Sequence, residues 1–146
     1  SGCRHHCPGC FNAVAWDFDY GEPFTEAVME HILELLRPDY IRGITYLGGE
    51  PFDPHNQPGL LALTQKIRAA YPEKSIWSFT GYVYGQNLPQ LPGVTDALLA
   101  GLDVLVDGPF IAARKNLGLR FRGSDNQRLI DLNATRRTGK LTLLTE

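Results

Sequence analysis

Apolar positions along the chain change between helical and strand spacing. Residues 24–37 carry apolar side chains at helical intervals, with Thr25 as the expected N-cap and Pro38 just past the end, so they predict an amphipathic helix. Short apolar runs bounded by turn residues predict strands. Further elements are expected on these two grounds: helices over 58–70 and 94–99, and strands over 41–47, 75–79 and 103–106.

Alternating strands and helices are typical of βαβ units, whose strands run parallel and whose ligands lie at the carboxyl ends of the strands. We therefore expect an α/β fold with a parallel sheet. At 146 residues the chain has the size of one domain and falls short of the roughly 250 residues of a full eightfold barrel, which leaves a partial barrel or an open sheet. The regular pattern fades after Phe110, so we expect a core over residues 1–127 and a loosely held C-terminal tail over 128–146.

Composition narrows the classes of partner. The formal net charge is −2, from 16 acidic and 14 basic side chains, so no broad basic surface for nucleic acid or anionic lipid is expected. No apolar stretch approaches the roughly 20 residues that cross a bilayer, and no secretory signal is visible. We expect a cytoplasmic protein that binds neither nucleic acid nor membrane.

All three cysteines lie close together near the start of the sequence, at Cys3, Cys7 and Cys10. An odd, clustered set argues against a disulfide framework and favours metal or redox chemistry. The C-x-x-x-C-x-x-C spacing allows three thiolates to bind one face of a [4Fe-4S] cluster, which usually has four cysteine ligands, so one iron is left open. Because the loop begins at residue 3, we expect the strand that leads into it to be truncated.

Zinc is the alternative, held by the three cysteines together with His5 or His6. Spacing alone does not exclude it, although zinc ligands are usually distributed as two separated pairs. If the site is a cluster, both histidines are expected to be solvated loop residues.

A second motif follows the strand expected over 41–47: Leu47-Gly48-Gly49-Glu50-Pro51. Two glycines at a strand end let the backbone approach a ligand closely, and the following carboxylate can accept hydrogen bonds from an ammonium group. A plain strand-to-helix turn explains the same residues.

Together the two motifs resemble those of the radical S-adenosylmethionine superfamily, which combines C-x-x-x-C-x-aromatic-C with G-G-E/D. Gly9 stands where that aromatic residue usually does, and C-P-G-C followed by an aromatic residue and Asn resembles the activating proteins of anaerobic ribonucleoside-triphosphate reductase. Three later segments resemble further motifs of these proteins: residues 77–82 their W-x-x-T-G-Y, 104–110 their V-L-V-D-G-[KP]-F, and 122–127 their R-G-S-x-N-Q. The last of these is expected to line the site, to contact the partner or to form a capped polar turn.

The resemblance implies a radical S-adenosylmethionine fold, a partial (β/α) barrel. It implies a [4Fe-4S] cluster on the three cysteines and S-adenosylmethionine bound through its amino and carboxylate groups to the open iron. Thr80 and Asp107 would hydrogen-bond the ribose or carboxylate of this cofactor, or else local backbone. The residues expected to bind the cofactor are Gly9, Cys10, Phe11, Gly48, Gly49, Glu50, Thr80 and Asp107, with Gly48, Gly49 and Glu50 at the methionyl amino group.

The activity that the resemblance implies is glycyl-radical generation. A low-potential donor such as flavodoxin or ferredoxin would reduce the cluster, and cleavage of S-adenosylmethionine would give methionine and a 5′-deoxyadenosyl radical. That radical would take a hydrogen atom from a glycine of anaerobic ribonucleoside-triphosphate reductase, with no side chain of this chain acting as catalytic acid or base. The alternatives are an activator of another glycyl-radical enzyme, of the formate-lyase type, and a non-enzymatic zinc or iron-sulfur binding module.

Overall fold

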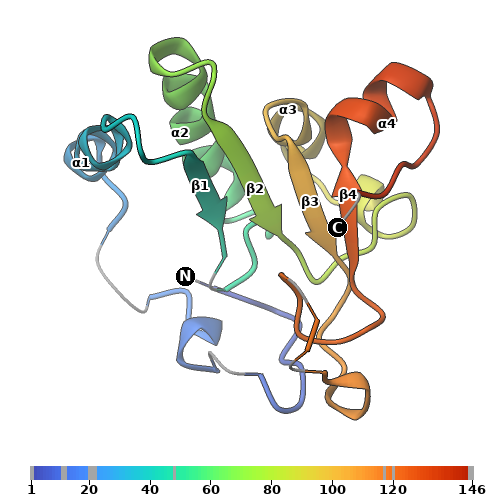
Figure 1. Ribbon diagram of the computed structural model, residues 1–146. Coiled ribbons are helices and arrows are strands. Elements are labelled where there is room, and N and C mark those ends of the chain that lie inside the picture. The colour runs from blue at the N-terminus through green and yellow to red at the C-terminus, as the bar shows by residue number, and fades with distance from the viewer. Residues whose placement is uncertain are drawn as a thin grey trace.

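The computed structural model describes residues 2–10, 13–19, 23–47, 49–116, 118–119 and 121–144. Helices and strands alternate along most of this length (Figure 1). In chain order the elements are η1 (Ala13–Trp16), α1 (Glu26–Leu36), β1 (Gly43–Tyr46), α2 (Gln57–Ala70), β2 (Ser75–Phe79), η2 (Leu88–Gln90), α3 (Thr95–Ala100), β3 (Val104–Asp107), η3 (Ala112–Arg114), β4 (Arg128–Asp131) and α4 (Leu132–Thr138), where η marks a 3₁₀-helix. Each helix and strand expected before residue 110 is present within two residues of its expected bounds. The α/β class is therefore confirmed.

The sheet has the order β1-β2-β3-β4. β1 pairs with β2 and β2 with β3 in parallel, as expected, whereas β3 and β4 pair antiparallel. The expectation of a wholly parallel sheet is wrong for that last pair. The chain leaves β3 at Asp107 and returns opposite it at Arg128. The connection therefore stays at one end of the sheet, and without a crossover β4 runs in the direction opposite to β3.

The helices form where capping and apolar spacing agree. Thr25 caps α1 by accepting a hydrogen bond from the Val28 amide at 3.4 Å, and Met29 and Leu36 on the same helix are buried. α1 packs on α2, and α2 packs on α3. Figure 1 shows α2 behind β1 and β2, and the N-terminal segment below the carboxyl ends of these strands.

One hydrophobic core joins the sheet to these helices. Ile76 on β2, Leu105 on β3 and Ile67 on α2 are fully buried, and Leu63 on α2 is 2% exposed. Burying each such side chain contributes about 1.5 to 3 kcal/mol relative to leaving it exposed. The core fixes the strands, and their carboxyl ends fix the loops that follow.

The stretch expected to be a loosely held tail adds to this core. Ile130 on β4 is fully buried and Leu132 on α4 is 2% exposed. The Asp131 side chain caps α4 by accepting from the Ala134 amide at 2.9 Å, and Gly139 ends it with φ of 72°. The looseness expected of residues 128–138 is thus wrong, because two short elements bury their apolar side chains there. In the part of the chain that the structure describes, no helix is long and apolar enough to span a membrane.

Replacing Ile130 by alanine tests whether β4 belongs to the core. The change removes a fully buried side chain, so we expect the free energy of unfolding in urea to fall by about 2 to 5 kcal/mol. Leu35→Ala is the control, since Leu35 on α1 is 59% exposed and its loss should change stability by no more than about 0.5 kcal/mol. Equal, small effects of the two changes would contradict the placement of β4.

Candidate functional site

The cysteine loop lies beyond the carboxyl ends of the parallel strands (Figure 1). Backbone contacts hold its first residues against the turn after β1: the Glu50 amide donates to the Gly2 carbonyl at 2.7 Å, and the Asn56 side-chain amide donates to the same oxygen at 3.1 Å. On the other side, the Cys3 amide donates to the Trp16 carbonyl of η1 at 3.3 Å. Residues far apart in sequence are thereby joined at the end of the sheet where parallel folds bind their ligands.

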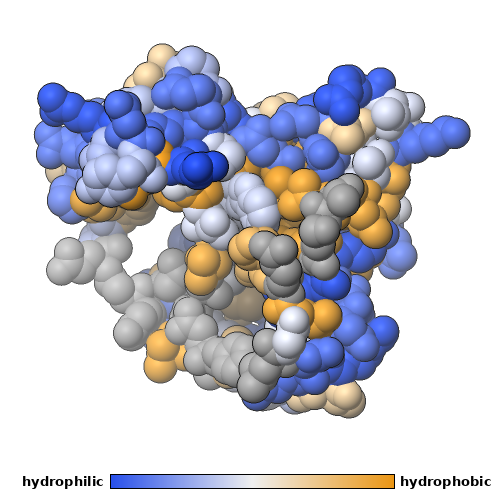
Figure 2. All heavy atoms as spheres, in the orientation of Figure 1, coloured by the Kyte–Doolittle hydropathy of each residue, from blue (hydrophilic) through white to orange (hydrophobic). Residues whose placement is uncertain are grey.

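A cavity of about 470 Å³ opens between this loop and the strand ends. Its volume is typical of small-molecule sites. Figure 2 shows the molecule hollowed below the sheet, with hydrophobic residues beside the hollow. The lining includes the three cysteines, Cys3, Cys7 and Cys10, together with residues that follow β1 and β2, namely Gly49, Glu50, Thr80 and Gly81. The structure thus brings the two sequence motifs to one cavity.

The chemistry of the three cysteines fits a cluster ligand set. Cys3 is buried, and this burial raises the pKa of its thiol, with the nearby charge of Glu50 raising it further. Cys3 is therefore a neutral thiol at neutral pH in the metal-free protein. Iron binds the thiolate, so cluster assembly would release a proton from this residue.

The two histidines beside the cysteines are engaged elsewhere. His5 Nε2 lies 2.6 Å from Glu50 Oε1, and its side chain is only 18% exposed, so the expectation of a solvated residue is wrong for His5. His6 stacks on Trp16 with ring centroids 4.4 Å apart. Among the described residues no group of three or more His, Cys, Asp or Glu is arranged so that it could hold a metal ion.

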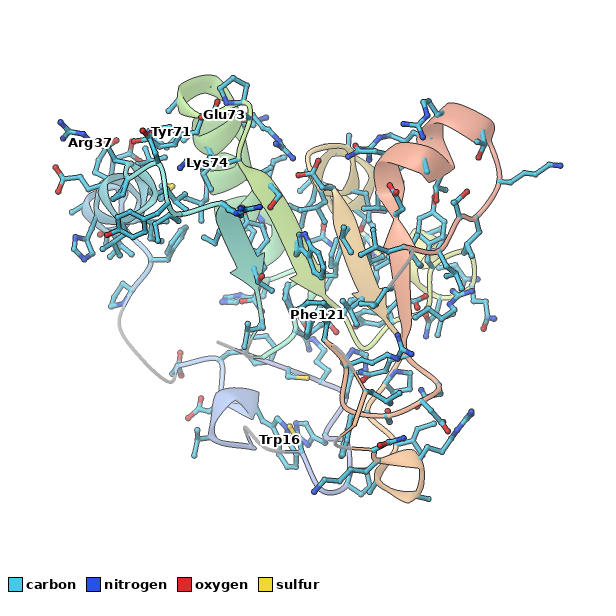
Figure 3. The ribbon with its side chains drawn as sticks, in the orientation of Figure 1. Trp16, Arg37, Tyr71, Glu73, Lys74 and Phe121 are labelled. Carbon is cyan, nitrogen blue, oxygen red and sulfur yellow. The ribbon has the colours of Figure 1, made fainter. Side chains whose placement is uncertain are left out.

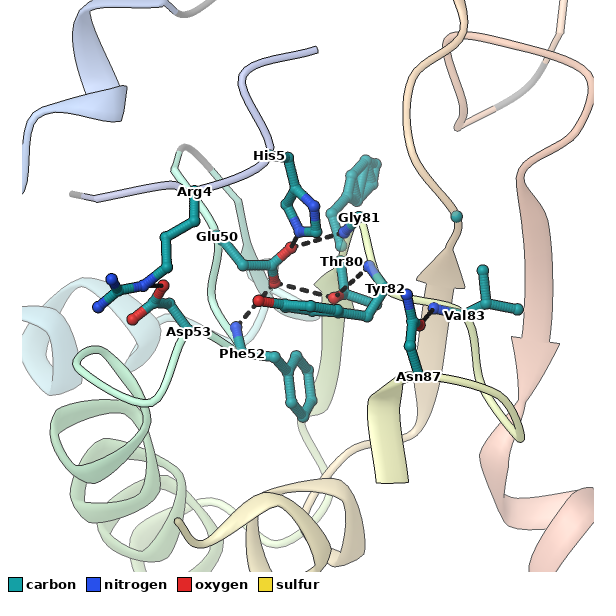
Figure 4. A network of polar contacts seen from close by, with 12 residues as sticks. Arg4, His5, Glu50, Phe52, Asp53, Thr80, Gly81, Tyr82, Val83 and Asn87 are labelled. Atoms are coloured by element: carbon teal, nitrogen blue, oxygen red, sulfur yellow. Dashed lines mark hydrogen bonds and ion pairs between the residues drawn. The ribbon is translucent and has the colours of Figure 1, made fainter. Parts of the chain in front are cut away.

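At the Gly-Gly-Glu turn, another segment of the backbone approaches Gly49 closely, as the two glycines predicted. A Cβ on Gly49 would lie 2.5 Å from the Gly2 carbonyl oxygen, so only glycine lets the cysteine loop approach this turn. Glu50 is 2% exposed, and its carboxylate accepts hydrogen bonds from His5, from the Thr80 hydroxyl at 2.8 Å and from two backbone amides (Figure 4). Gly48 and Phe11, two other residues expected to bind the cofactor, lie outside the described residues.

Two other expected residues, Thr80 and Asp107, differ in where they lie. Thr80 lines the cavity and donates its hydroxyl to Glu50. Asp107 does not line it; its carboxylate accepts from both Nε and Nη2 of Arg128, at 3.0 and 2.5 Å, and from the Tyr84 amide. These contacts favour the alternative that Asp107 is a strand-end residue bonded locally. Gly9 likewise lies beside Ala112 and is not part of the lining.

Aromatic side chains form part of the cavity wall, and no motif of the sequence marked them. Trp16 lies on the N-terminal segment below the sheet, and Phe121 lies beside the strand ends (Figure 3). Phe121 packs edge-on against Trp77, with centroids 5.2 Å apart. Arg122 and Gln127, from the late motif, also line the cavity, while Gln127 Oε1 accepts from the Gly123 amide at 2.9 Å. That motif is both a capped turn and part of the wall.

A cavity lined by three clustered cysteines indicates an iron-sulfur protein with a single cluster. A family model described as a 4Fe-4S single cluster domain matches residues 1–130. The anaerobic ribonucleoside-triphosphate reductase-activating protein of Escherichia coli (strain K12) is 42% identical over 129 residues, which are 87% of this chain and 81% of the relative. The protein of the same name from Enterobacteria phage T4 is 37% identical over 131 residues, 88% of this chain and 78% of the relative. No solved structure matches the chain.

This chain belongs to the family of anaerobic ribonucleoside-triphosphate reductase-activating proteins. The resemblance read from its motifs is confirmed, and the chain is an activating enzyme with a 4Fe-4S domain.

The ion pair between Asp107 and Arg128 gives a test of what Asp107 does. Asp107→Asn removes a buried, charged acceptor of hydrogen bonds from Arg128. We therefore expect the free energy of unfolding in urea to fall by about 1.5 to 3 kcal/mol. The matched control is Asp125→Asn, whose partner Arg114 is exposed, with an expected loss of no more than about 1 kcal/mol. Unchanged stability of the Asp107 variant, combined with loss of cofactor binding, would contradict the structural role and would show that Asp107 helps to bind the cofactor.

Proposed function

We propose that this chain is a radical S-adenosylmethionine enzyme that generates the glycyl radical of anaerobic ribonucleoside-triphosphate reductase. The observation that carries the proposal is the shared cavity: Cys3, Cys7 and Cys10 line the same 470 Å³ space as Gly49 and Glu50. Family membership supplies the partner, because the relatives are named for activating that reductase. We also propose that the mostly parallel sheet is part of a radical S-adenosylmethionine type of partial barrel.

The cysteines would hold a [4Fe-4S] cluster, and three protein ligands leave one iron for S-adenosylmethionine. The turn at residues 48–50 would bind the methionyl amino group, with Gly49 giving backbone access and Glu50 giving negative charge. Thr80 keeps that charge in place through its hydrogen bond to Glu50. When bound, the reduced cluster and S-adenosylmethionine supply the radical chemistry, with the electron coming from a flavodoxin or ferredoxin.

The chain's own side chains orient the cofactor and exclude water. Trp16 and Phe121 form apolar wall on two sides of the cavity. Two of the lining residues are also well exposed, Leu47 at 66% and Phe121 at 52%, so the cavity has an apolar rim. A protein segment that carries the target glycine would cover this rim and complete the exclusion of water.

The proposal is tested by radical formation on the partner. Anaerobic reductase is mixed with reductant, S-adenosylmethionine and this protein, and the glycyl-radical signal is measured by paramagnetic resonance. We expect a signal only when all components are present, and no detectable signal with Cys7→Ala, because two thiolates cannot hold the cluster. Leu35→Ala, a change of an exposed residue on α1, should keep the full signal.

Two results would contradict this function. One is a signal on a formate-lyase type of enzyme and none on the reductase, which would change the partner. The other is conversion of a small molecule with release of 5′-deoxyadenosine and no radical on any protein.

A further inference from the structure

His5 lies between two of the cysteines yet its side chain points to the turn after β1. Its Nε2 lies 2.6 Å from Glu50 Oε1 (Figure 4). Both side chains are shielded from solvent, His5 at 18% exposure and Glu50 at 1%. Both also line the cavity. Because a carboxylate only accepts, the Nε2–H of His5 is the donor.

The residues that follow β2 pack against the imidazole ring of His5. A Cβ on Gly81 would lie 2.7 Å from two atoms of the His5 ring, so the ring packs where only glycine leaves room. Tyr82 contacts the ring edge-on, with centroids 4.4 Å apart and an angle of 63° between the planes. Packing on two sides and a hydrogen bond at its tip fix the orientation of this ring.

The Glu50 carboxylate is a junction of three segments. Oε2 accepts from the Phe52 amide and the Thr80 hydroxyl, both at 2.8 Å, and Oε1 accepts from the Gly81 amide and His5, both at 2.6 Å. Four donors fill the roughly four lone-pair positions of a carboxylate. Of these recorded donors, His5 alone comes from the cysteine loop.

A second contact joins the same two segments outside the cavity. Arg4 Nε donates to Asp53 Oδ2 at 2.7 Å, and Arg4 also lies over the Phe18 ring, 4.9 Å from its centroid. Asp53 is buried, whereas Arg4 is 65% exposed. Neither residue lines the cavity. This pair therefore ties the loop down without touching the ligand space, which makes it the natural comparison.

We propose that His5 is a positioning residue for the ligand in this cavity. By donating to Glu50, it holds the carboxylate in one orientation and sets the cysteine loop at a fixed place relative to the turn that presents the negative charge. The inference rests on the proposed function for the identity of the ligand, the amino-acid part of S-adenosylmethionine. With the lone pairs of Glu50 filled, the carboxylate offers a cationic ligand a fixed charge. Losing His5 would leave Oε1 with the Gly81 amide alone and would untie the cysteine loop from this turn.

The test uses two amides at position 5 that differ in reach. The side-chain nitrogen of glutamine can take the place of Nε2, whereas that of asparagine ends near Nδ1 and falls short of Glu50. The wild type, His5→Asn, His5→Gln and Arg4→Gln are reconstituted anaerobically. Iron and sulfide per chain, the dissociation constant for S-adenosylmethionine by calorimetry, and the unfolding midpoint of the metal-free chain are then measured.

We expect His5→Asn to keep its iron and sulfide but to bind S-adenosylmethionine at least about tenfold more weakly, because the charge-assisted hydrogen bond that positions Glu50 and the cysteine loop is lost. His5→Gln should recover binding to within about threefold of wild type. Arg4→Gln should bind like the wild type even if its unfolding midpoint falls, because its contact lies outside the cavity.

Three results would overturn the positioning role: wild-type affinity in His5→Asn, loss of the cluster itself in that variant, or equal weakening in Arg4→Gln. The first would show that Glu50 does not need His5 to bind the ligand, and the second that His5 is needed for the cluster itself. The third would show that the contact between His5 and Glu50 only holds the cysteine loop in place, as the contact between Arg4 and Asp53 does. Failure of the proposed function gives a different pattern, in which the wild type holds iron but does not bind S-adenosylmethionine.

Discussion

The buried carboxylate of Glu50 is the constraint on which the arrangement of the site depends. An ionised group taken out of water is costly unless donors replace the water. Here the donors come from its own turn, from the segment after β2 and from the cysteine loop. Satisfying one carboxylate therefore joins the cysteine loop to the two turns that follow β1 and β2, and it does so at the wall of the cavity.

The sheet supplies the frame that makes this convergence possible. β1 and β2 run parallel, so the turns that follow them emerge at the same end, where Glu50 meets Thr80. The opposite end of the strands is closed by structural contacts, such as Arg68 on α2 donating to Asp103 at 2.7 Å. In other parallel folds, too, contacts at one end of the strands stabilise the fold and ligands bind at the other end.

The sequence predicted the parts of this molecule whose signals are local. Helical spacing and Thr25 located α1, and the cysteine spacing and the Gly-Gly-Glu turn located the cavity. The late helix α4 was missed: it had an N-cap at Asp131 and a terminal Gly139, but its seven residues are mostly polar and show too little apolar periodicity to stand out. The role of His5 could not be read from the sequence, because its partner is 45 positions away and nothing local marks the contact. The division of the chain at residue 127 and the truncated first strand stay predictions.

All the chemistry proposed for this site depends on the three cysteines holding a [4Fe-4S] cluster with one iron open to S-adenosylmethionine. The most direct measurement is the paramagnetic resonance spectrum of the anaerobically reconstituted, reduced protein, recorded with and without S-adenosylmethionine, alongside metal analysis. We expect about four iron and four sulfide per chain and a reduced-cluster signal whose shape changes when S-adenosylmethionine is added. One zinc per chain without iron, or a cluster signal that S-adenosylmethionine leaves unchanged, would contradict it.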